Sequence, residues 1–248
     1  MSAREVICED FDLALDDLKS QGFRLDAIYP ADDPHTATLS RGAEAIRVTT
    51  EPAAAPPGDL PEFAPEFVIS RGGTAGEGRA GMFYRDLIPG RLGGRYIASH
   101  ITIPGGGPVP DWVHFHRIAL QMIMVRRGWV RVVYEDQGEP FVMNCGDLVL
   151  QPPQIRHRVL ESSPGLEVVE ITAPALHETL ADHELSLPNQ MVNRDRSFGG
   201  QRFLHHVAAT GGPIGLADAT RGLADAQVLT SPTDVPPHAG ELVFGFVL

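Results

Sequence analysis

The sequence predicts a mainly β protein whose principal domain is an antiparallel sandwich or barrel. From residue 82 to about residue 175, short runs rich in Val, Ile, Tyr and Met alternate with Gly and Pro at regular intervals. No helical periodicity interrupts these runs, and this regular spacing is typical of an antiparallel sandwich or barrel. A segment with a helix-containing pattern precedes this region, so a small α/β unit is expected in front of the β domain.

Residues 1–52 are predicted to form this small α/β segment. Asp10 is suited to cap a helix, because apolar residues follow it at helical spacing, and Gly22 suits the position after the helix end. Three strands separated by two turns are predicted next: residues 23–30, 36–40 and 44–50. This helix-then-hairpin order resembles half of a vicinal-oxygen-chelate (glyoxalase-like) module. The metal ligands of that family have no counterpart here, so none are assigned.

Residues 53–81 are predicted to be a Pro/Gly-rich linker. Its Pro- and Ala-rich first half favours a stiff, extended chain. The glycine-rich stretch from Arg71 to Gly81 lacks the strand before it and the helix after it that a phosphate-binding loop needs. We therefore expect no nucleotide site in the linker.

Charge and composition narrow the set of partners. The chain has 20 Lys and Arg residues against 32 Asp and Glu residues, a net charge of −12, which argues against nucleic acid as a partner. The two cysteines, Cys8 and Cys145, form no disulfide framework and no zinc motif. No apolar stretch resembles a signal peptide or a membrane span. A cytoplasmic protein with a small-molecule partner is expected.

A candidate metal site lies at the start of the most apolar run of the β region. His114 and His116 are two residues apart, so both side chains point the same way on a strand. Gln121 follows five positions later and begins a new strand after a turn. A Pro-Pro pair then ends a later strand and can direct His157 towards the first three residues. A lone His-X-His also occurs on exposed strands, so the site depends on His157 joining the pair.

The spacing of these residues resembles the two sequence motifs of the cupin family. The upstream motif has a glycine, His-X-His, an acid and a second glycine, and the downstream motif has a glycine, a proline and a histidine. The matching positions are Gly107, His114, His116, Gln121 and Gly128, followed by Gly146, Pro152 and His157. Gln121 stands where the family usually has Glu, Gln154 replaces a glycine, and the first spacer is one residue longer than usual.

The resemblance implies a cupin double-stranded β-helix, or jelly roll, over residues 82–178 that holds one divalent transition metal ion. The implied ligands are His114, His116, Gln121 and His157, and Fe, Mn, Ni, Co or Zn suits three imidazoles and an amide oxygen. Two roles stay open for Gln121, as a metal ligand or as a hydrogen-bond donor to a bound water. Gln also occurs at this position in cupins of uronate-sugar and polyketide metabolism, so it is compatible with metal binding.

Residues 179–248 are predicted to contain a connector and an incomplete second cupin repeat. Aligning residues 221–248 with residues 91–125 places His238 opposite His116, whereas the other two polar positions are lost. The strands of this repeat are expected to cap the first barrel, to pair with another subunit, or to be the start of a longer repeat. Because open sheet edges favour pairing, a homodimer is expected.

Several further residues are candidates for chemistry at the metal. Three neutral imidazoles and a neutral amide leave the ion its full 2+ charge, which favours an anionic oxygen ligand such as a carboxylate or an enolate. Arg117 and Arg156 are candidate substrate-binding residues that would steer an acid inward, although either can equally be a surface charge. Candidate residues for proton transfer on inward strand faces are Tyr84, His100, Tyr134 and Glu170.

The predicted function is that of a metal-dependent cupin enzyme. Its substrate would be a small oxygen-rich organic acid or a sugar-acid-like molecule, and the reaction would be a Lewis-acid isomerisation, cyclisation or lyase step. With iron as the metal, a dioxygenase reaction becomes possible. The alternative is a non-catalytic ligand-binding or sensor cupin, because the fold hosts many functions.

Overall fold

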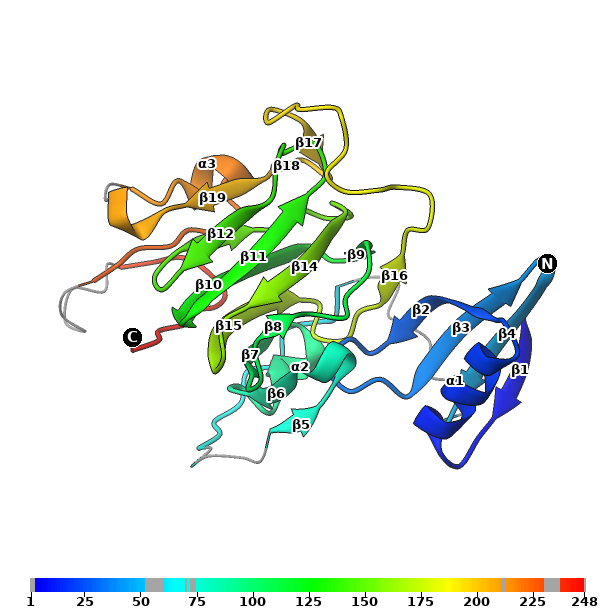
Figure 1. Ribbon diagram of the computed structural model, residues 1–248. Helices are drawn as coiled ribbons and strands as arrows, with labels where there is room; N and C mark the ends of the chain where they lie inside the picture. The colour runs from blue at the N-terminus through cyan, green and yellow to red at the C-terminus, as the bar shows by residue number, and fades with distance from the viewer. Residues whose placement is uncertain are drawn as a thin grey trace.

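Two sheets face each other around an apolar core, and a smaller α/β unit continues one of them (Figure 1). The computed structural model describes residues 3–51, 60–69, 71, 75–210, 213–229 and 237–247. Part of the predicted linker and part of the predicted second repeat lie outside these described residues. The predicted fold class, mainly β with a small N-terminal α/β segment, is confirmed.

The first sheet has ten strands and runs through both units. In spatial order its strands are β1 (Arg4–Ile7), β4 (Glu44–Thr49), β3 (Thr36–Arg41), β2 (Arg24–Tyr29), β16 (Thr179–Ala181), β9 (His114–His116), β14 (His157–Ser162), β11 (Trp129–Tyr134) and β12 (Phe141–Asn144), with β8 (Gly107–Pro108) beside β14. Every pair is antiparallel except β1 with β4.

The second sheet has seven strands and covers the other side of the core. Its spatial order is β19 (Leu204–His206), β13 (Leu148–Leu150), β10 (Leu120–Arg127), β15 (Leu166–Ala173), β7 (Ile97–Ile103), β6 (Phe83–Asp86) and β5 (Gly76–Glu77). A separate hairpin pairs β17 (Ser197–Phe198) with β18 (Gln201–Arg202). The short helices are α2 (Arg91–Gly94), α3 (Leu216–Thr220) and the 3-10 turns η1 (Arg79–Gly81) and η2 (Ala208–Thr210).

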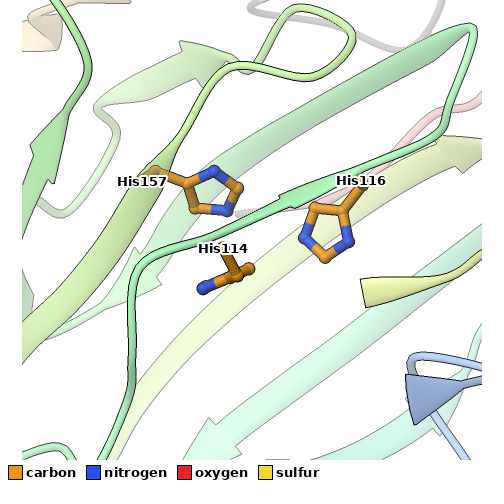
Figure 2. A group of neighbouring side chains, drawn as sticks. All are labelled: His114, His116 and His157. Carbon is orange, nitrogen blue, oxygen red and sulfur yellow. The ribbon is translucent and has the colours of Figure 1, made fainter. Parts of the chain in front are cut away.

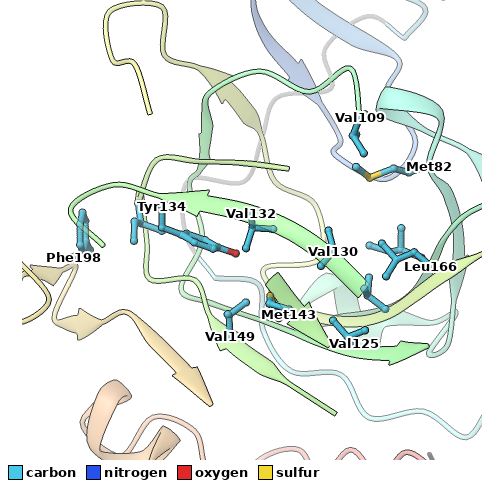
Figure 3. Close-up of a cluster of buried hydrophobic side chains, with 13 residues drawn as sticks. Met82, Val109, Val125, Val130, Val132, Tyr134, Met143, Val149, Leu166 and Phe198 are labelled. Atoms are coloured by element: carbon cyan, nitrogen blue, oxygen red, sulfur yellow. The ribbon is translucent and has the colours of Figure 1, made fainter. Parts of the chain in front are cut away.

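The core of the barrel is built from alternate residues of strands in both sheets. Figure 3 shows Val130, Val132 and Met143 from the first sheet near Val125 and Val149 from the second, and all five are buried. Burying a side chain of this size stabilises the fold by roughly 1.5–3 kcal/mol. The same alternation that turns these residues inward also directs polar residues of β9, β10 and β15 into the barrel.

The N-terminal unit has the predicted helix and hairpin. Helix α1 (Phe11–Ser20) begins where the Asp10 side chain accepts a hydrogen bond from the Leu13 N–H at 2.9 Å, and it ends before Gly22, whose φ is +87°. The apolar face of α1 packs on a buried cluster that includes Leu39 and Ile46. Strand β1, which the sequence pattern did not indicate, pairs with β4 and completes a four-stranded layer.

Strand β16 joins the two units. Its three residues pair with β9 of the barrel on one side and with β2 of the N-terminal unit on the other. The predicted barrel boundary at residue 178 therefore falls just before a strand that belongs to the barrel sheet. Strand β19 likewise pairs with β13, so residues of the predicted connector complete the first barrel.

The C-terminal segment differs from the expected second repeat. Within its described residues 221–229 and 237–247 there is no strand. Helix α3 packs against the outer face of the second sheet, where its Leu216 joins Leu120 and Leu150 in a buried cluster. A strand forms only beside the open edge of another strand. The outer face of the sheet presents apolar side chains instead, so the segment packs on it by side-chain contact. The strands expected to cap the barrel are therefore absent from these described residues, and the other two arrangements stay predictions.

The predicted linker also contributes to the barrel at its end. Residues 60–69 have no regular secondary structure, as expected for an extended linker, but β5 and η1 lie within the predicted range 53–81. Strand β5 pairs with β6 and so extends the second sheet. No helix among the described residues is long and apolar enough to span a bilayer.

Candidate metal centre

Three buried histidines meet between the two sheets. Strand β9 carries His114 and His116, and β14 begins at His157, which lies directly opposite His114 in the antiparallel register. One nitrogen of each ring lies within 4.8 Å of a nitrogen of the other two, and all three residues are buried (Figure 2). The predicted convergence of two sequence segments on one centre is therefore present.

Each of these rings is oriented by a backbone carbonyl group. The Nδ1 atom of His114 lies 2.7 Å from the Trp112 oxygen, that of His116 lies 3.3 Å from the Glu178 oxygen, and that of His157 lies 3.0 Å from the Ile155 oxygen. A carbonyl oxygen only accepts hydrogen bonds, so each Nδ1 carries the hydrogen and donates it. The lone pair of each neutral ring is then on Nε2, as metal-binding histidines require.

The histidines of the two motifs thus lie on paired strands of one sheet, and Gln121 lies on β10 (Leu120–Arg127) of the sheet on the other side of the barrel. This is the arrangement that the cupin resemblance implies. The histidine triad fits a divalent transition metal, because three imidazole nitrogens with fixed tautomers suit Fe, Mn, Ni, Co or Zn. Asp111 adds an outer contact of the kind such sites have, since its buried carboxylate lies 3.5 Å from His114 Nδ1 and accepts a hydrogen bond from the Val159 N–H at 2.9 Å.

Comparison with solved structures finds weak similarity over part of this chain. A variant of oxalate decarboxylase from Bacillus subtilis aligns over 57% of this chain and 48% of its own, with 14% identity and a TM-score of 0.37. The Clostridium difficile EutQ protein aligns over 38% of this chain and 68% of its own, with 16% identity and a TM-score of 0.30. The Schizosaccharomyces pombe Cnp3 cupin domain gives 10% identity and a TM-score of 0.30 over 38% of this chain and 64% of its own.

These alignments leave much of each protein unmatched. The chain spans a third to a half of the oxalate decarboxylase chains. No protein-family model and no curated protein matches the sequence.

Gln121 takes part in a buried chain of hydrogen bonds. The Tyr134 hydroxyl donates to Gln151 Oε1 at 2.5 Å, and Gln151 Nε2 donates to Gln121 Oε1 at 2.9 Å. Burial raises the pKa of Tyr134, and the nearby charge of Glu170 raises it further, so this phenol keeps its proton and acts as a donor. One lone pair of Gln121 Oε1 is thereby engaged with Gln151. Whether the oxygen also binds metal stays a prediction.

A small polar cavity adjoins the triad at His116. Its volume is about 20 Å³, enough for about one water molecule. Both sheets contribute to it, and so does the loop between β2 and β3 of the N-terminal unit. The lining residues are Ala31, Asp32, Tyr84, Ile97, Ser99, His116, Gln121, Glu170 and His177. Of the predicted proton-transfer residues, Tyr84 and Glu170 line this cavity, and Tyr134 lies behind it, stacked on His157.

Three other predicted site residues lie elsewhere. His100 directly follows the cavity-lining Ser99 on β7, so its side chain points to the opposite face of the sheet. There its Nε2 atom lies 2.9 Å from Glu167 Oε2. Arg156 stacks on Phe115, which points away from the two histidines beside it, and bonds Asp182 at 2.9 Å. Arg117 is exposed and bonds Glu178 at 3.1 Å. Neither arginine lines the cavity, so the steering role proposed for them has no support in the geometry.

Several residues of the site were not indicated by the sequence, and His177, Asp32 and Gln151 are among them. His177 is buried, donates from Nδ1 to the carbonyl groups of Pro174 and Ala175, and packs edge-on against His116 at 5.2 Å between ring centroids. Asp32 comes from a turn of the N-terminal unit, and Gln151 from the end of β13. No motif marks them, although Gln151 directly precedes the Pro-Pro pair of the downstream motif and lies in the inward alternation of that strand.

A second hollow lies away from this centre. It has a volume of about 390 Å³ and lies between residues 66–69 and residues 87–92. Its volume exceeds that of the triad cavity, but none of the three histidines lines it. The chemistry of the donor atoms, and not the volume, therefore identifies the candidate site.

Proposed function

We propose that the protein is a metal-dependent cupin enzyme that binds a small oxygen-containing substrate at the histidine triad. The observation that carries this proposal is the set of three Nε2 lone pairs, each fixed by a hydrogen bond from Nδ1 to a backbone carbonyl. Fixing all three tautomers in this way is characteristic of metal ligation. A bound divalent ion would act as a Lewis acid on a carbonyl, hydroxyl or carboxylate oxygen.

The residues of the chain would bind and orient the substrate and carry protons. Glu170 is the carboxylate of the barrel wall, and its Oε1 accepts a hydrogen bond from the Thr172 hydroxyl at 3.1 Å. This bond fixes the carboxylate beside the cavity, where its other oxygen can accept a proton from the substrate. Tyr134 keeps its proton and donates a hydrogen bond to Gln151, which in turn donates to Gln121, so the two amide groups are held in fixed orientations.

The charge of the cavity limits the substrate. Two carboxylates, Asp32 and Glu170, line it, and Arg91, which pairs with Asp32, is already bound to two acids. A substrate with several negative charges would be repelled by these carboxylates. We infer that the substrate has at most one ionised group, whose charge a metal ion held by the histidine triad would neutralise. A small hydroxy or keto acid meets this condition.

A second candidate function is that of a non-catalytic metal-binding sensor or ligand-binding protein. The observation in its favour is the small volume of the cavity, which holds about one water molecule. An enzyme with this site must open before a larger substrate reaches the metal. A sensor needs no such opening, because occupation of the metal site alone would stabilise the fold.

Metal analysis of purified protein variants tests the proposal. The full chain, purified without added metal, is expected to carry about one transition metal ion per chain, and the His114→Ala/His157→Ala double variant roughly none. The matched control is His238→Ala, which removes an exposed histidine of the C-terminal segment. Metal retained at the wild-type level by the double variant would contradict the proposal.

Turnover separates the two candidate functions. Metal-loaded wild-type protein is incubated with a panel of small hydroxy and keto acids, and products are followed by mass spectrometry. Product formation that the double variant lacks supports an enzyme. Thermal stabilisation by an acid without any product supports the sensor.

A further inference from the structure

Asp32 brings a carboxylate from the N-terminal unit to the wall of the metal cavity. It lies in the loop between β2 and β3, and together with Ala31 it lines the cavity that also contains His116 and Gln121. Its side chain is only 13% exposed. The neighbouring residue Asp33 is exposed, so the loop directs one of its two acidic residues inward.

Arg91 holds Asp32 in this position. Its Nη2 donates to Asp32 Oδ2 at 2.6 Å, and its Nε donates to Asp86 Oδ2 at 2.7 Å. Asp86 lies opposite the cavity-lining Ser99 in the register of β6 and β7, so the guanidinium joins the barrel wall to the N-terminal loop. The backbone of Arg91 has a φ of +53°, a region that residues other than glycine rarely adopt. The surrounding structure therefore determines its conformation closely.

The second carboxylate oxygen of Asp32 lacks a hydrogen-bond donor among the described residues. Oδ1 is buried, and no hydrogen-bond donor in the described part of the chain reaches it. A buried anionic oxygen without a donor is unfavourable unless a cation or a donor lies beside it in the functional state. Glu170, the other acid of the cavity, differs because the Thr172 hydroxyl donates to it.

A divalent ion held by the histidine triad would be a suitable partner for Asp32 Oδ1. Three neutral imidazoles and the amide of Gln121, which stands where the cupin motif usually has Glu, carry no negative charge. A divalent ion held by them would keep its whole charge in a buried site. A carboxylate nearby offsets this charge and stabilises the bound ion.

We propose that Asp32 is the charge-balancing carboxylate of the metal centre, supplied by the N-terminal unit and positioned by Arg91. The inference rests on the proposed metal function and deepens it. Under this arrangement the N-terminal unit is part of the metal site. The alternative is that Asp32 only anchors Arg91, in which case it contributes to stability and not to metal affinity.

Titration of the chelator-treated full chain with Co²⁺, followed by calorimetry, distinguishes these roles. Asp32→Asn keeps the size of the side chain and an oxygen that accepts from Arg91, and removes the charge. We expect it to weaken Co²⁺ binding by about 10- to 100-fold, the range found for outer-shell partners of metal ligands. Asp33→Asn, the matched control next to it, should leave the affinity within about twofold of wild type.

A second variant tests the role of Arg91 and guards against misfolding of the first. Arg91→Lys keeps the charge but loses the two-pronged contact, so it should weaken Co²⁺ binding by a smaller factor. The variant that combines Asp32→Asn with Arg91→Lys should bind Co²⁺ no more weakly than Asp32→Asn alone, because both substitutions act through the same carboxylate.

The outcomes separate the two proposals. If wild-type protein binds no Co²⁺, the proposed function and this inference both fail. If wild type binds Co²⁺ and both Asp32→Asn and Arg91→Lys bind it equally well, the metal function stands and the role of Asp32 is refuted. A lower melting temperature of Asp32→Asn with unchanged affinity would likewise assign Asp32 to anchoring alone.

Discussion

The hydrogens on the histidine rings are placed by the backbone. His157 donates to the carbonyl group two residues before it, and His114 does the same. His116 instead uses the carbonyl of Glu178, from the residue that precedes β16. Two of the three histidines are therefore oriented by their own local chain, whereas the third depends on a segment about sixty positions further along the sequence.

Tyr134 gives the site a measurable dependence on pH. Burial raises its pKa in the folded protein, whereas in the unfolded chain it ionises near its ordinary value of 10.0. Below pH 10 the stabilising effect of Tyr134 is complete. Above pH 10 the phenol loses its proton in the unfolded chain only, which lowers the free energy of the unfolded state and so reduces the stability of the fold. We expect the stability advantage of wild type over Tyr134→Phe to shrink by about 1.4 kcal/mol per pH unit above pH 10.

Urea unfolding of both proteins between pH 8 and about pH 11 measures this difference. Comparison with Tyr134→Phe cancels the contributions of the other groups that titrate in the same range. An advantage that stays constant across the range would show that Tyr134 ionises equally in both states, contrary to the prediction.

Two short strands position residues of the site. Strands β9 and β16 have three residues each, yet their pairing puts Thr179 beside His116, with Thr179 Oγ1 3.3 Å from His116 Nδ1. Such strands are too short to show a clear alternating pattern in a sequence. Their positions follow from their neighbours, so β9 was predicted only through its histidines and β16 was not predicted.

The turn between β12 and β13 requires glycine at position 146. Gly146 has a φ of +90°, and a Cβ atom there would lie 2.9 Å from the Ala208 Cβ. We expect Gly146→Ala to lower the free energy of unfolding by about 1–3 kcal/mol, because the backbone strain and the close contact add together. Chemical denaturation measures this change.

Gly105→Ala is the control for this substitution. Gly105 has no atom within 4 Å of the added methyl group and no positive φ. Its replacement should change the stability by less than about 0.5 kcal/mol, as expected away from buried or strained positions. Equal effects of the two substitutions would remove the argument for a special turn at Gly146.

Features that depend on local sequence patterns were predicted correctly, whereas features that depend on packing between distant segments were not. The barrel, the helix that begins after Asp10 and the convergence of His114, His116 and His157 follow from local patterns and motif spacing, and all are present. Asp32 and His177 join the site through tertiary packing between separate segments, which no local pattern encodes. The face of the sheet to which the side chains of Arg117 and Arg156 point depends on strand register. It could not be predicted from the sequence without knowing which strands pair.

The whole molecule is expected to unfold as one cooperative unit. The first sheet is continuous through β2 and β16, and the Arg91–Asp32 ion pair adds a second connection. Leu39→Ala, a change in the fully buried core of the N-terminal unit, should therefore lower the stability by about 2–5 kcal/mol. It should also lower the urea midpoint reported by the two tryptophans, which both lie in the barrel.

Separate transitions would contradict this expectation. If tryptophan fluorescence of the Leu39→Ala variant keeps the wild-type midpoint while circular dichroism shows an earlier phase, the units unfold independently. Leu13→Ala is a suitable control, because Leu13 lies on the exposed side of α1 and its truncation removes little buried surface.

The loop between β2 and β3 is a suitable place to vary the cavity by protein engineering. It reaches the cavity from a hairpin whose own strands lie outside the barrel, so its length and composition can be varied while the histidine-bearing strands keep their sequence. A library randomised at residue 31 and residues 33–35, with Asp32 retained, would sample new cavity walls beside unchanged histidine-bearing strands. Selectivity for the bound molecule would then be tuned separately from the metal ligands.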